Sequence, residues 1–323
     1  MQKHILLIAL SLGLFTTSCK TSKKHDPKTQ QAQIDTTTVR THLYTLAADD
    51  MEGRKTGTPG IEKAAQYIEG EFKKIGLKTF ENLSSYRQNF KIKDLDAFNL
   101  IGVLEGKSKK DEYVVVSAHY DHLGIRQKEG QTDSIYNGAD DDASGTTAVL
   151  TLAKYFSKKR NNERTIIFIA FTAEEMGLLG SKHFGKDVDA SKYVAGINIE
   201  MIGKDSKFGP KTAWLSGFER SDFGKIIQKN LEGTGYVLHP DPYPKFNLFF
   251  RSDNASLARL GIPSHTFSTG PIDTDSHYHQ ASDEAVTLKV TNITETIRAI
   301  ALGTESIING TDTPTRVIID DKN

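Results

Sequence analysis

Apolar residues recur along this chain with spacings that predict a regular alternation of strands and helices. Short apolar runs predict buried strands over residues 113–118, 165–171, 194–199, 213–216 and 263–267. Expected helices cover residues 61–75, 144–156, 177–184, 221–231, 253–260 and 290–308, and Gly76 is a helix stop after the first of them. Strands that alternate with helices are typical of parallel pairing, because each helix carries the chain back across the sheet. The pattern therefore predicts an α/β fold with helices on both faces of a largely parallel sheet.

The predicted elements form one uninterrupted unit. No linker divides residues 36–310, so we expect a single domain with a mixed, largely parallel central sheet, followed by a C-terminal tail over residues 311–323. In sheets of this kind the reactive crevice lies at the carboxyl ends of the strands. Polar clusters at those ends are therefore candidates for chemistry.

The N-terminal segment follows a different pattern. Residues 5–15 form an apolar run behind Lys3 and His4, with the length of a signal peptide and too short to span a bilayer. The one cysteine, Cys19, follows small residues where a bacterial lipoprotein signal is cleaved, although Thr16 stands where such signals usually have leucine. We expect residues 1–19 to be a lipoprotein-type signal peptide and residues 20–35 to be a flexible tether.

Two consequences follow for location. Lipidated Cys19 would anchor an exported protein to a membrane of a bacterial cell envelope, on its periplasmic or surface side. The alternative is an ordinary secretory signal with an incidental cysteine, and in that case the protein also leaves the cytoplasm.

Composition narrows the class of protein further. The 41 basic and 41 acidic residues balance to a formal net charge of +0, which argues against nucleic-acid binding. A single cysteine excludes an internal disulfide framework. A mean hydropathy of -0.43 excludes a multi-span membrane protein.

Two polar clusters combine histidines with carboxylates. At the end of a predicted strand, residues 118–122 read Ala-His-Tyr-Asp-His, in which His119 is a candidate metal ligand and Asp121 a partner for its second ring nitrogen. Residues 137–145, Asn-Gly-Ala-Asp-Asp-Asp-Ala-Ser-Gly, lead into a predicted helix. Three adjacent carboxylates repel one another unless they are solvated or bind cations. Taken alone, either segment also fits a surface loop, with Ser144 as a helix cap.

Two further clusters add acids and a pair of histidines. Glu174 and Glu175 follow a predicted strand, and adjacent glutamates can divide metal binding from general-base work. Glu200 ends another strand, where a buried charge without a partner is costly. His277 and His279 flank a tyrosine before the last helix. Each cluster alone also fits an exposed loop or helix start. Together they supply nitrogen and oxygen ligands without thiolate, which suits zinc and also cobalt or manganese.

In this combination and order, the clusters resemble the zinc-dependent exopeptidases of the bacterial secreted aminopeptidase family, metallopeptidase family twenty-eight. The resemblance runs from about residue 46 to about residue 308 and includes supporting segments at residues 48–54 and 57–60. It implies a zinc exopeptidase fold, peptide substrates and two Zn²⁺ ions per chain.

The resemblance also implies the metal ligands. Those of the first zinc would be His119, Asp141 and Glu200. Those of the second would be Asp141, Glu175 and His279, so that Asp141 bridges both ions. The peptide bond after Asp141 would be cis.

Roles for two more residues follow from the same resemblance, as do two departures from the family's pattern. Glu174 would be the general base, and Asp121 would orient His119. Glu200 stands where the family usually has aspartate and is one methylene longer, so the first zinc should be the more exchangeable one. Asn254 stands where relatives often have histidine, which predicts altered contacts on the substrate side.

The implied function is that of an aminopeptidase, in which water activated by two metals and by Glu174 hydrolyses the bond after the N-terminal residue. Three alternatives share the fold: a single-zinc glutaminyl cyclase, a carboxypeptidase, and a catalytically inactive binding lipoprotein. Similar cyclases carry tryptophan where Tyr278 precedes His279 here, and inactive relatives usually lose the base or ligands. The expected partners are peptide substrates, and a membrane only through Cys19.

Overall fold

The computed structural model of this 323-residue chain describes residues 33–130 and 132–319. The expected signal peptide over residues 1–19, lipidated Cys19 and most of the tether over residues 20–35 lie outside the described residues. None of the described helices is long and apolar enough to cross a membrane.

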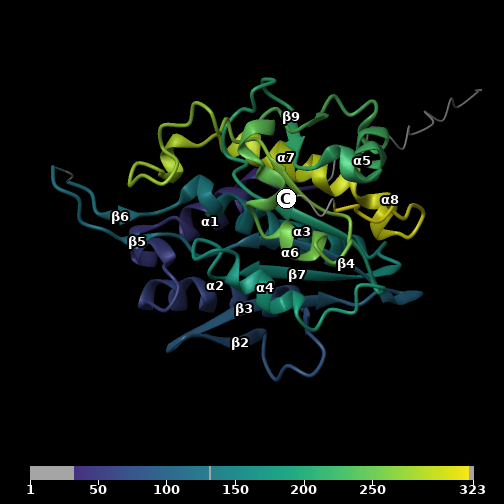
Figure 1. Cartoon of the computed structure of the whole chain (residues 1–323), viewed down its shortest axis with the longest axis horizontal. Helices are drawn as coiled ribbons and strands as arrows, with labels where there is room; N and C mark the ends of the chain where they lie inside the picture. The colour runs from purple at the N-terminus through teal and green to yellow at the C-terminus, as the bar shows by residue number, and fades with distance from the viewer. Residues whose placement is uncertain (1–32, 131, 320–323) are drawn as a thin grey trace, which may run out of the picture.

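A mixed sheet of nine strands runs through the middle of the described molecule (Figure 1). Its four central strands are parallel, in the order β7 (Arg164–Phe171), β4 (Lys109–His119), β8 (Tyr193–Ile199) and β11 (Ser264–Ser268). On one side β3 (Leu95–Leu104) pairs antiparallel with β7, β1 (Lys78–Thr79) and β2 (Arg87–Ile92). On the other side β9 (Thr212–Leu215) pairs antiparallel with β11 and parallel with β10 (Val237–Pro240). The expected mixed sheet is confirmed, and its parallel part is the centre.

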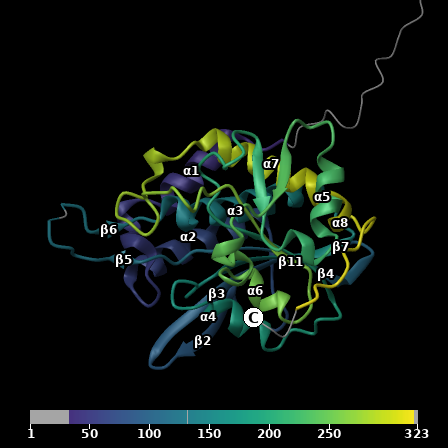
Figure 2. The ribbon, with the colours of Figure 1, turned by 45° about the horizontal axis from the view of Figure 1, so that its top comes forward.

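Helices cover both faces of this sheet, as expected (Figure 2). Neighbouring residues of one strand point to opposite faces, so Val114 and Val116 belong to one apolar cluster and Val115 to another. The larger cluster includes residues of six helices: α1 (Thr36–Leu46), α2 (Pro59–Ile75), α3 (Gly145–Lys159), α5 (Phe223–Leu231), α7 (Val290–Gly303) and α8 (Glu305–Ile308). The smaller cluster includes Phe184 of α4 (Leu179–Gly185) and Leu257 of α6 (Asn254–Ala258).

Smaller elements complete the fold. A two-stranded ribbon of β5 (Gly124–Ile125) and β6 (Ile135–Tyr136) extends from the body in both views (Figure 1; Figure 2). Short helical turns lie at Asp49–Arg54, Phe218–Arg220, Pro244–Phe246, Leu248–Phe250 and Ala285–Thr287. The described part of the expected tail, residues 311–319, packs on the domain through Val317, whose N–H donates to the carbonyl of Gly261.

All six expected helices begin or end at other residues in the structure, and for two of them the cause is visible. The expected closing helix over residues 290–308 is two helices, α7 and α8 (Glu305–Ile308). The break follows Gly303, a poor helix former, and Thr304 accepts hydrogen bonds from Ile307 and Ile308 at the start of α8. The helix expected over residues 177–184 begins at Leu179, because Gly177 and Leu178 have φ angles of 97° and 61°.

Parallel pairing brings the carboxyl ends of the central strands to one edge of the sheet. His119 is the last residue of β4, and Phe171 and Ile199 end β7 and β8. The polar segments that follow these strands therefore meet at one place, which is the expected crevice.

Candidate metal centre

The centre is assembled from five segments of the chain. His119 ends β4, Glu174 and Glu175 lie in the loop after β7, and Glu200 directly follows β8. Asp141 lies in the loop Ala139–Ser144 before α3, and His279 lies in the loop between β11 and α7. All five residues expected as ligands converge, as does Glu174.

Asp141 is the central group of this cluster. Its Oδ1 lies 3.1 Å from Nε2 of His119, and its Oδ2 lies 3.1 Å from Nε2 of His279. The same nitrogen of His279 lies 3.3 Å from Oε2 of Glu175. Ligand atoms of His119, Asp141 and Glu200 lie within 4.8 Å of one another. Asp141 thus belongs to two groups of side chains through different oxygens.

Several buried atoms of the cluster make no hydrogen bond of acceptable geometry with the described residues, although some of them lie within 3.1 Å of one another. They are Nε2 of His119, both ring nitrogens of His122, Oε1 of Glu175 and Oε2 of Glu200. A buried polar atom without a partner is costly, so these atoms need a ligand. Histidine nitrogens and carboxylate oxygens are donors that zinc accepts. The residues present therefore fit a metal ion.

His122 is the residue of this centre to which the sequence reasoning assigned no role. Its Nδ1 lies 2.8 Å from Oε1 of Glu175 and 3.9 Å from Oδ2 of Asp141, and it forms a second candidate ligand group with these two carboxylates. The signal was present in the sequence, because His122 stands three residues after His119 in the same loop.

Asp121 contacts His119 and connects the loop after β4 to the loop after β7. Nδ1 of His119 is 3.1 Å from the Asp121 carbonyl oxygen and 3.8 Å from its carboxylate. The carboxylate accepts hydrogen bonds from the Glu174 N–H and the Thr56 hydroxyl. Burial raises the pKa of Asp121 to about 6, and the charge of His119 opposes that shift.

Glu174 and the ligands share a strongly charged environment. Burial raises the pKa of Glu174 well above its usual value, and the charges of Glu200 and Asp253 raise it further. Burial lowers the pKa of His119, but the charge of Glu174 and the other nearby carboxylates outweigh it and raise that pKa well above normal. A cation between these carboxylates would relieve their mutual repulsion.

The loop that carries Asp141 is held from two sides. The fully buried Arg54 donates to the carbonyls of Tyr120, Asn137 and Gly138 at 2.6–2.9 Å. From the other side, the Asp283 carboxylate accepts hydrogen bonds from the N–H groups of Asp140 and Asp141 at 3.0–3.1 Å.

Two backbone features shape this loop. Gly138 has a φ of 52°, and a Cβ there would lie 2.3 Å from the Asp141 carbonyl oxygen, so only glycine fits. The Asp141–Asp142 peptide bond is cis, as the resemblance implies.

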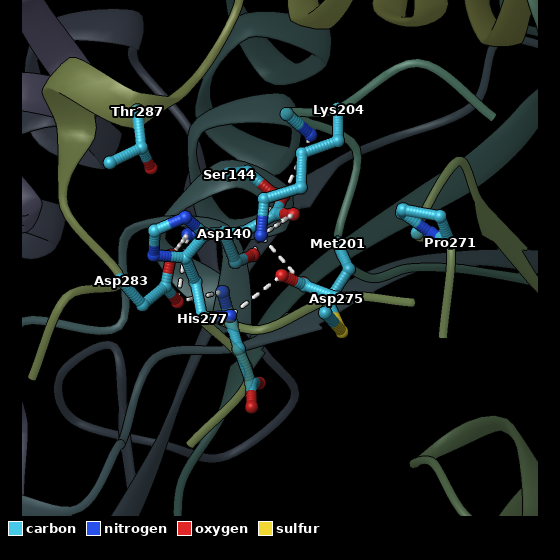
Figure 3. A network of polar contacts seen from close by, with 12 residues as sticks. Asp140, Ser144, Met201, Lys204, Pro271, Asp275, His277, Asp283 and Thr287 are labelled. Carbon is cyan, nitrogen blue, oxygen red and sulfur yellow. Dashed lines mark hydrogen bonds and ion pairs between the residues drawn. The ribbon is translucent and has the colours of Figure 1, made fainter. Parts of the chain in front are cut away.

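A lysine connects the Asp141 loop to the loop of His279 (Figure 3). Nζ of Lys204 lies 2.5 Å from Asp275 and 3.5 Å from Oδ2 of Asp140. Asp140 also accepts a hydrogen bond from the Gly203 N–H at 2.7 Å, and Asp275 accepts one from the His277 N–H at 2.9 Å. This ion-pair network joins the segments after β8, before α3 and after β11.

Asn254, expected to alter substrate contacts, is part of the interior instead. Its side-chain amide donates to the carbonyls of Phe249 and Ser264, and its oxygen accepts from Thr266. The residue is buried and serves the packing of α6 against β11.

Comparison with known proteins gives consistent matches. The model of Peptidase family M28 matches residues 99–303. "Aminopeptidase YwaD" of Bacillus subtilis is 26% identical over 243 residues, which are 72% of this chain and 42% of the relative. The chain thus spans less than half the length of that relative. The structure of a zinc aminopeptidase from Bacillus subtilis is similar with a TM-score of 0.71 and 15% identity, over 91% of this chain and all of that one (100%).

A protein with another activity shares the same fold. The glutaminyl cyclase of Porphyromonas gingivalis is similar with a TM-score of 0.68 and 15% identity, over 86% of this chain and 100% of that one. At such identities the likeness concerns the fold alone. The choice between these activities depends on the side chains of the centre.

Proposed function

Because the chain belongs to Peptidase family M28, we propose that it is a zinc-dependent exopeptidase, an aminopeptidase that hydrolyses the N-terminal residues of peptides. The observation that carries this proposal is the pair of ligand groups that share Asp141 beside Glu174. The names of relatives, an aminopeptidase and a zinc aminopeptidase, support the same activity.

The proposal includes two zinc ions per chain. His119, Asp141 and Glu200 would hold the first. Asp141, Glu175 and His279 would hold the second, and His122 lies beside the same two carboxylates. When bound, zinc supplies positive charge that polarises a carbonyl group and lowers the pKa of water.

Glu174 would move the proton. It lines an open pocket of about 390 Å³ together with Asp141, Glu175 and Glu200, so its carboxylate faces the space that a substrate would enter. Its raised pKa makes it a stronger base than an exposed glutamate once ionised. It would accept a proton from the attacking water at its carboxylate and donate that proton to the leaving amine.

The side chains favour a peptidase over the cyclase and the carboxypeptidase. Two overlapping ligand groups suit two ions, whereas the cyclase expectation is a single zinc. Tyr278, whose ring stacks on His279 at a centroid distance of 3.9 Å, stands where the cyclase resemblance leads us to expect tryptophan. For the choice between the two ends of a peptide, the carboxylates around the centre suit an α-ammonium group.

A panel of aminoacyl fluorogenic substrates, with metal analysis, tests the proposal. We expect hydrolysis that a chelator abolishes and zinc restores. Glu174→Gln should lower kcat at least about 100-fold, because the base is lost, and should keep the bound zinc. Glu219→Gln, which removes an exposed carboxylate, is the matched control. Chelator-resistant hydrolysis, or cyclisation of N-terminal glutamine without hydrolysis, would reject the aminopeptidase.

We also propose that Cys19 anchors the protein to a membrane of the cell envelope. The support is its place as the one cysteine, directly after an apolar run of signal-peptide length. Cys19→Ser should move the protein from the membrane fraction to the soluble fraction after cell disruption. Unchanged membrane fractionation and processing of the variant would reject lipidation.

A further inference from the structure

A small cavity adjoins the open pocket of the metal centre. Its volume is about 40 Å³, and its lining includes Met201, Trp214 and Ser268. Glu200, Arg251 and Tyr278 line both the cavity and the open pocket, so these three residues form the passage between them. A substrate whose reacting bond lies over the carboxylates could therefore extend a side chain into the cavity.

Three neutral polar side chains of the cavity lining already donate within the protein. The Ser268 hydroxyl donates to the carbonyl of Met201, and the Trp214 indole N–H donates to the carbonyl of Gly270. The Thr266 hydroxyl likewise donates to Asn254. The donor hydrogens of these three side chains are therefore not free for a substrate side chain.

Arg251 differs from them, because its guanidinium is free. It is the one cation of the cavity lining, and its side chain forms no hydrogen bond or ion pair with any residue in the two described ranges. By contrast, Arg54, Arg87 and Arg164 use their guanidinium groups in buried or partly buried hydrogen bonds. Arg251 is exposed and lines both the cavity and the open pocket, so it lies at the passage between them.

Charge and size together define what this cavity would take. A guanidinium offers paired donors that match a carboxylate. Each water-sized group needs roughly 10–15 Å³ of such volume, so the cavity admits a short side chain and excludes a large aromatic one. Glu200 is the acid of the same lining, and its charge would be offset by the metal that it ligates.

We propose that Arg251 selects peptides whose N-terminal residue has a carboxylate side chain, aspartate or glutamate. The inference rests on the proposed aminopeptidase function and names its substrate class. Arg251 acts as a specificity residue: it binds the side-chain carboxylate while the chemistry takes place over Asp141 and Glu174.

Glutamyl and glutaminyl substrates with the same fluorogenic leaving group test this, because they differ in charge and hardly in shape. We expect kcat/KM to favour glutamyl at least about tenfold, the value of one charge-assisted hydrogen bond. Arg251→Gln should abolish that preference, and Arg251→Lys should restore part of it. As a binding readout, calorimetry on zinc-loaded Glu174→Gln protein should show L-glutamate binding more tightly than L-glutamine.

Two further variants locate the effect. Arg40→Gln removes another exposed guanidinium, one that lies over the Tyr44 ring on α1, and should leave the preference unchanged. A preference that disappears in Arg259→Gln and persists in Arg251→Gln would overturn the assignment, because Arg259 lines only the open pocket.

The outcomes separate the two proposals. Chelator-sensitive hydrolysis with equal kcat/KM for glutamyl and glutaminyl substrates would overturn the role of Arg251 and leave the aminopeptidase standing. Absence of chelator-sensitive hydrolysis across the whole aminoacyl panel would overturn both.

Discussion

Asp141 uses its two carboxylate oxygens for two different partners, and this makes it the least replaceable group of the centre. Oδ1 faces His119 and Oδ2 faces His279. An amide in its place would present one oxygen and one N–H, which cannot accept at both positions. Glu200 has a simpler task, since it completes only the group of His119 and Asp141.

Glu200→Ala should therefore remove one zinc of two and most of the activity. The remaining zinc stays, because Glu175 and His279 are unchanged. Metal analysis of the purified variant at saturating zinc, with turnover measured in parallel, checks this expectation. Glu219→Ala should keep both metals and full activity. Two zinc ions and wild-type turnover in Glu200→Ala would contradict the assignment.

His122 is expected to support the second metal by holding Glu175. Its Nδ1 lies 2.8 Å from Oε1 of that residue. Loss of a side chain that orients a ligand typically weakens metal binding 10–100-fold, and His122→Ala should show about that loss. Competition with a zinc chelator measures it, with His239→Ala, which changes a ring stacked on Phe208, as the control. Equal zinc affinities for both variants would show that His122 is not needed.

For single residues, the family resemblance was sufficient to name the candidate ligands that the structure brings together, but not the residues that hold them. His119, Glu175 and Glu200 stand beside strand ends that the apolar pattern already located, and Asp141 precedes a helix that it also located. Lys204 and Asp283 carried no such signal, because their role depends on loops that meet only in three dimensions.

Loops, rather than strands, set the geometry of the centre, and ion pairs connect those loops. Lys204 follows β8 and contacts acids from two other segments, Asp140 before α3 and Asp275 after β11 (Figure 3). Its side chain is 15% exposed, and each of the two acids is 1% exposed. Removing the lysine would leave two buried carboxylates without their cation.

Lys204→Met should lower the free energy of unfolding by about 3 kcal/mol, the usual effect of breaking a buried ion pair. It should also lower kcat, since the loop of His279 loses the ion pair between Asp275 and Lys204. Urea unfolding measures the first effect and aminoacyl hydrolysis the second. Combining it with Asp275→Asn should cost less than the sum of the two single changes. Strict additivity would show that Lys204 and Asp275 do not interact energetically.

The starts and ends of helices and strands depend on local hydrogen bonds, which the apolar pattern does not predict. Helix α1 was not predicted, since it begins with three threonines, which are poor helix formers. Asp35, whose carboxylate accepts hydrogen bonds from the N–H groups of Thr37 and Thr38, is the signal that would have located it. The strands of the antiparallel edge were also missed. Strand β3 pairs with the distant β7, and β2 pairs with β3 across the tight turn at Lys93 and Asp94, so only the second pairing is local.

Over the whole molecule, two buried histidines connect stability to pH. His42 accepts or donates a hydrogen bond at 2.7 Å with Tyr67, and His265 contacts the Ser216 carbonyl and the Ser221 hydroxyl. Burial lowers the pKa of each to about 4, from a usual value of 6.5. The folded state therefore binds fewer protons than the unfolded state between these two pH values.

The stability that this contributes is present above pH 6.5 and is lost as the pH falls towards 4. The loss should amount to about 3 kcal/mol per histidine at most, given 1.36 kcal/mol for each pKa unit. Urea unfolding at a series of pH values should show this slope as the difference between wild type and the double variant, because the buried carboxylates titrate alike in both. His42→Asn and His265→Asn should each remove about half of it, and an unchanged slope in the double variant would contradict the explanation.

The Asp141 loop is hydrogen-bonded by residues that lie far apart in the sequence, and this has a consequence for biosynthesis. Arg54 comes early in the described chain and Asp283 late, and both bind the segment that carries Asp141. The ribosome therefore releases Asp283 only after most of the described chain has been made. Until Asp283 has been made, the N–H groups of Asp140 and Asp141 lack their acceptor. A nascent or truncated chain therefore cannot complete the centre. The proposed peptidase would therefore stay inactive during its own synthesis.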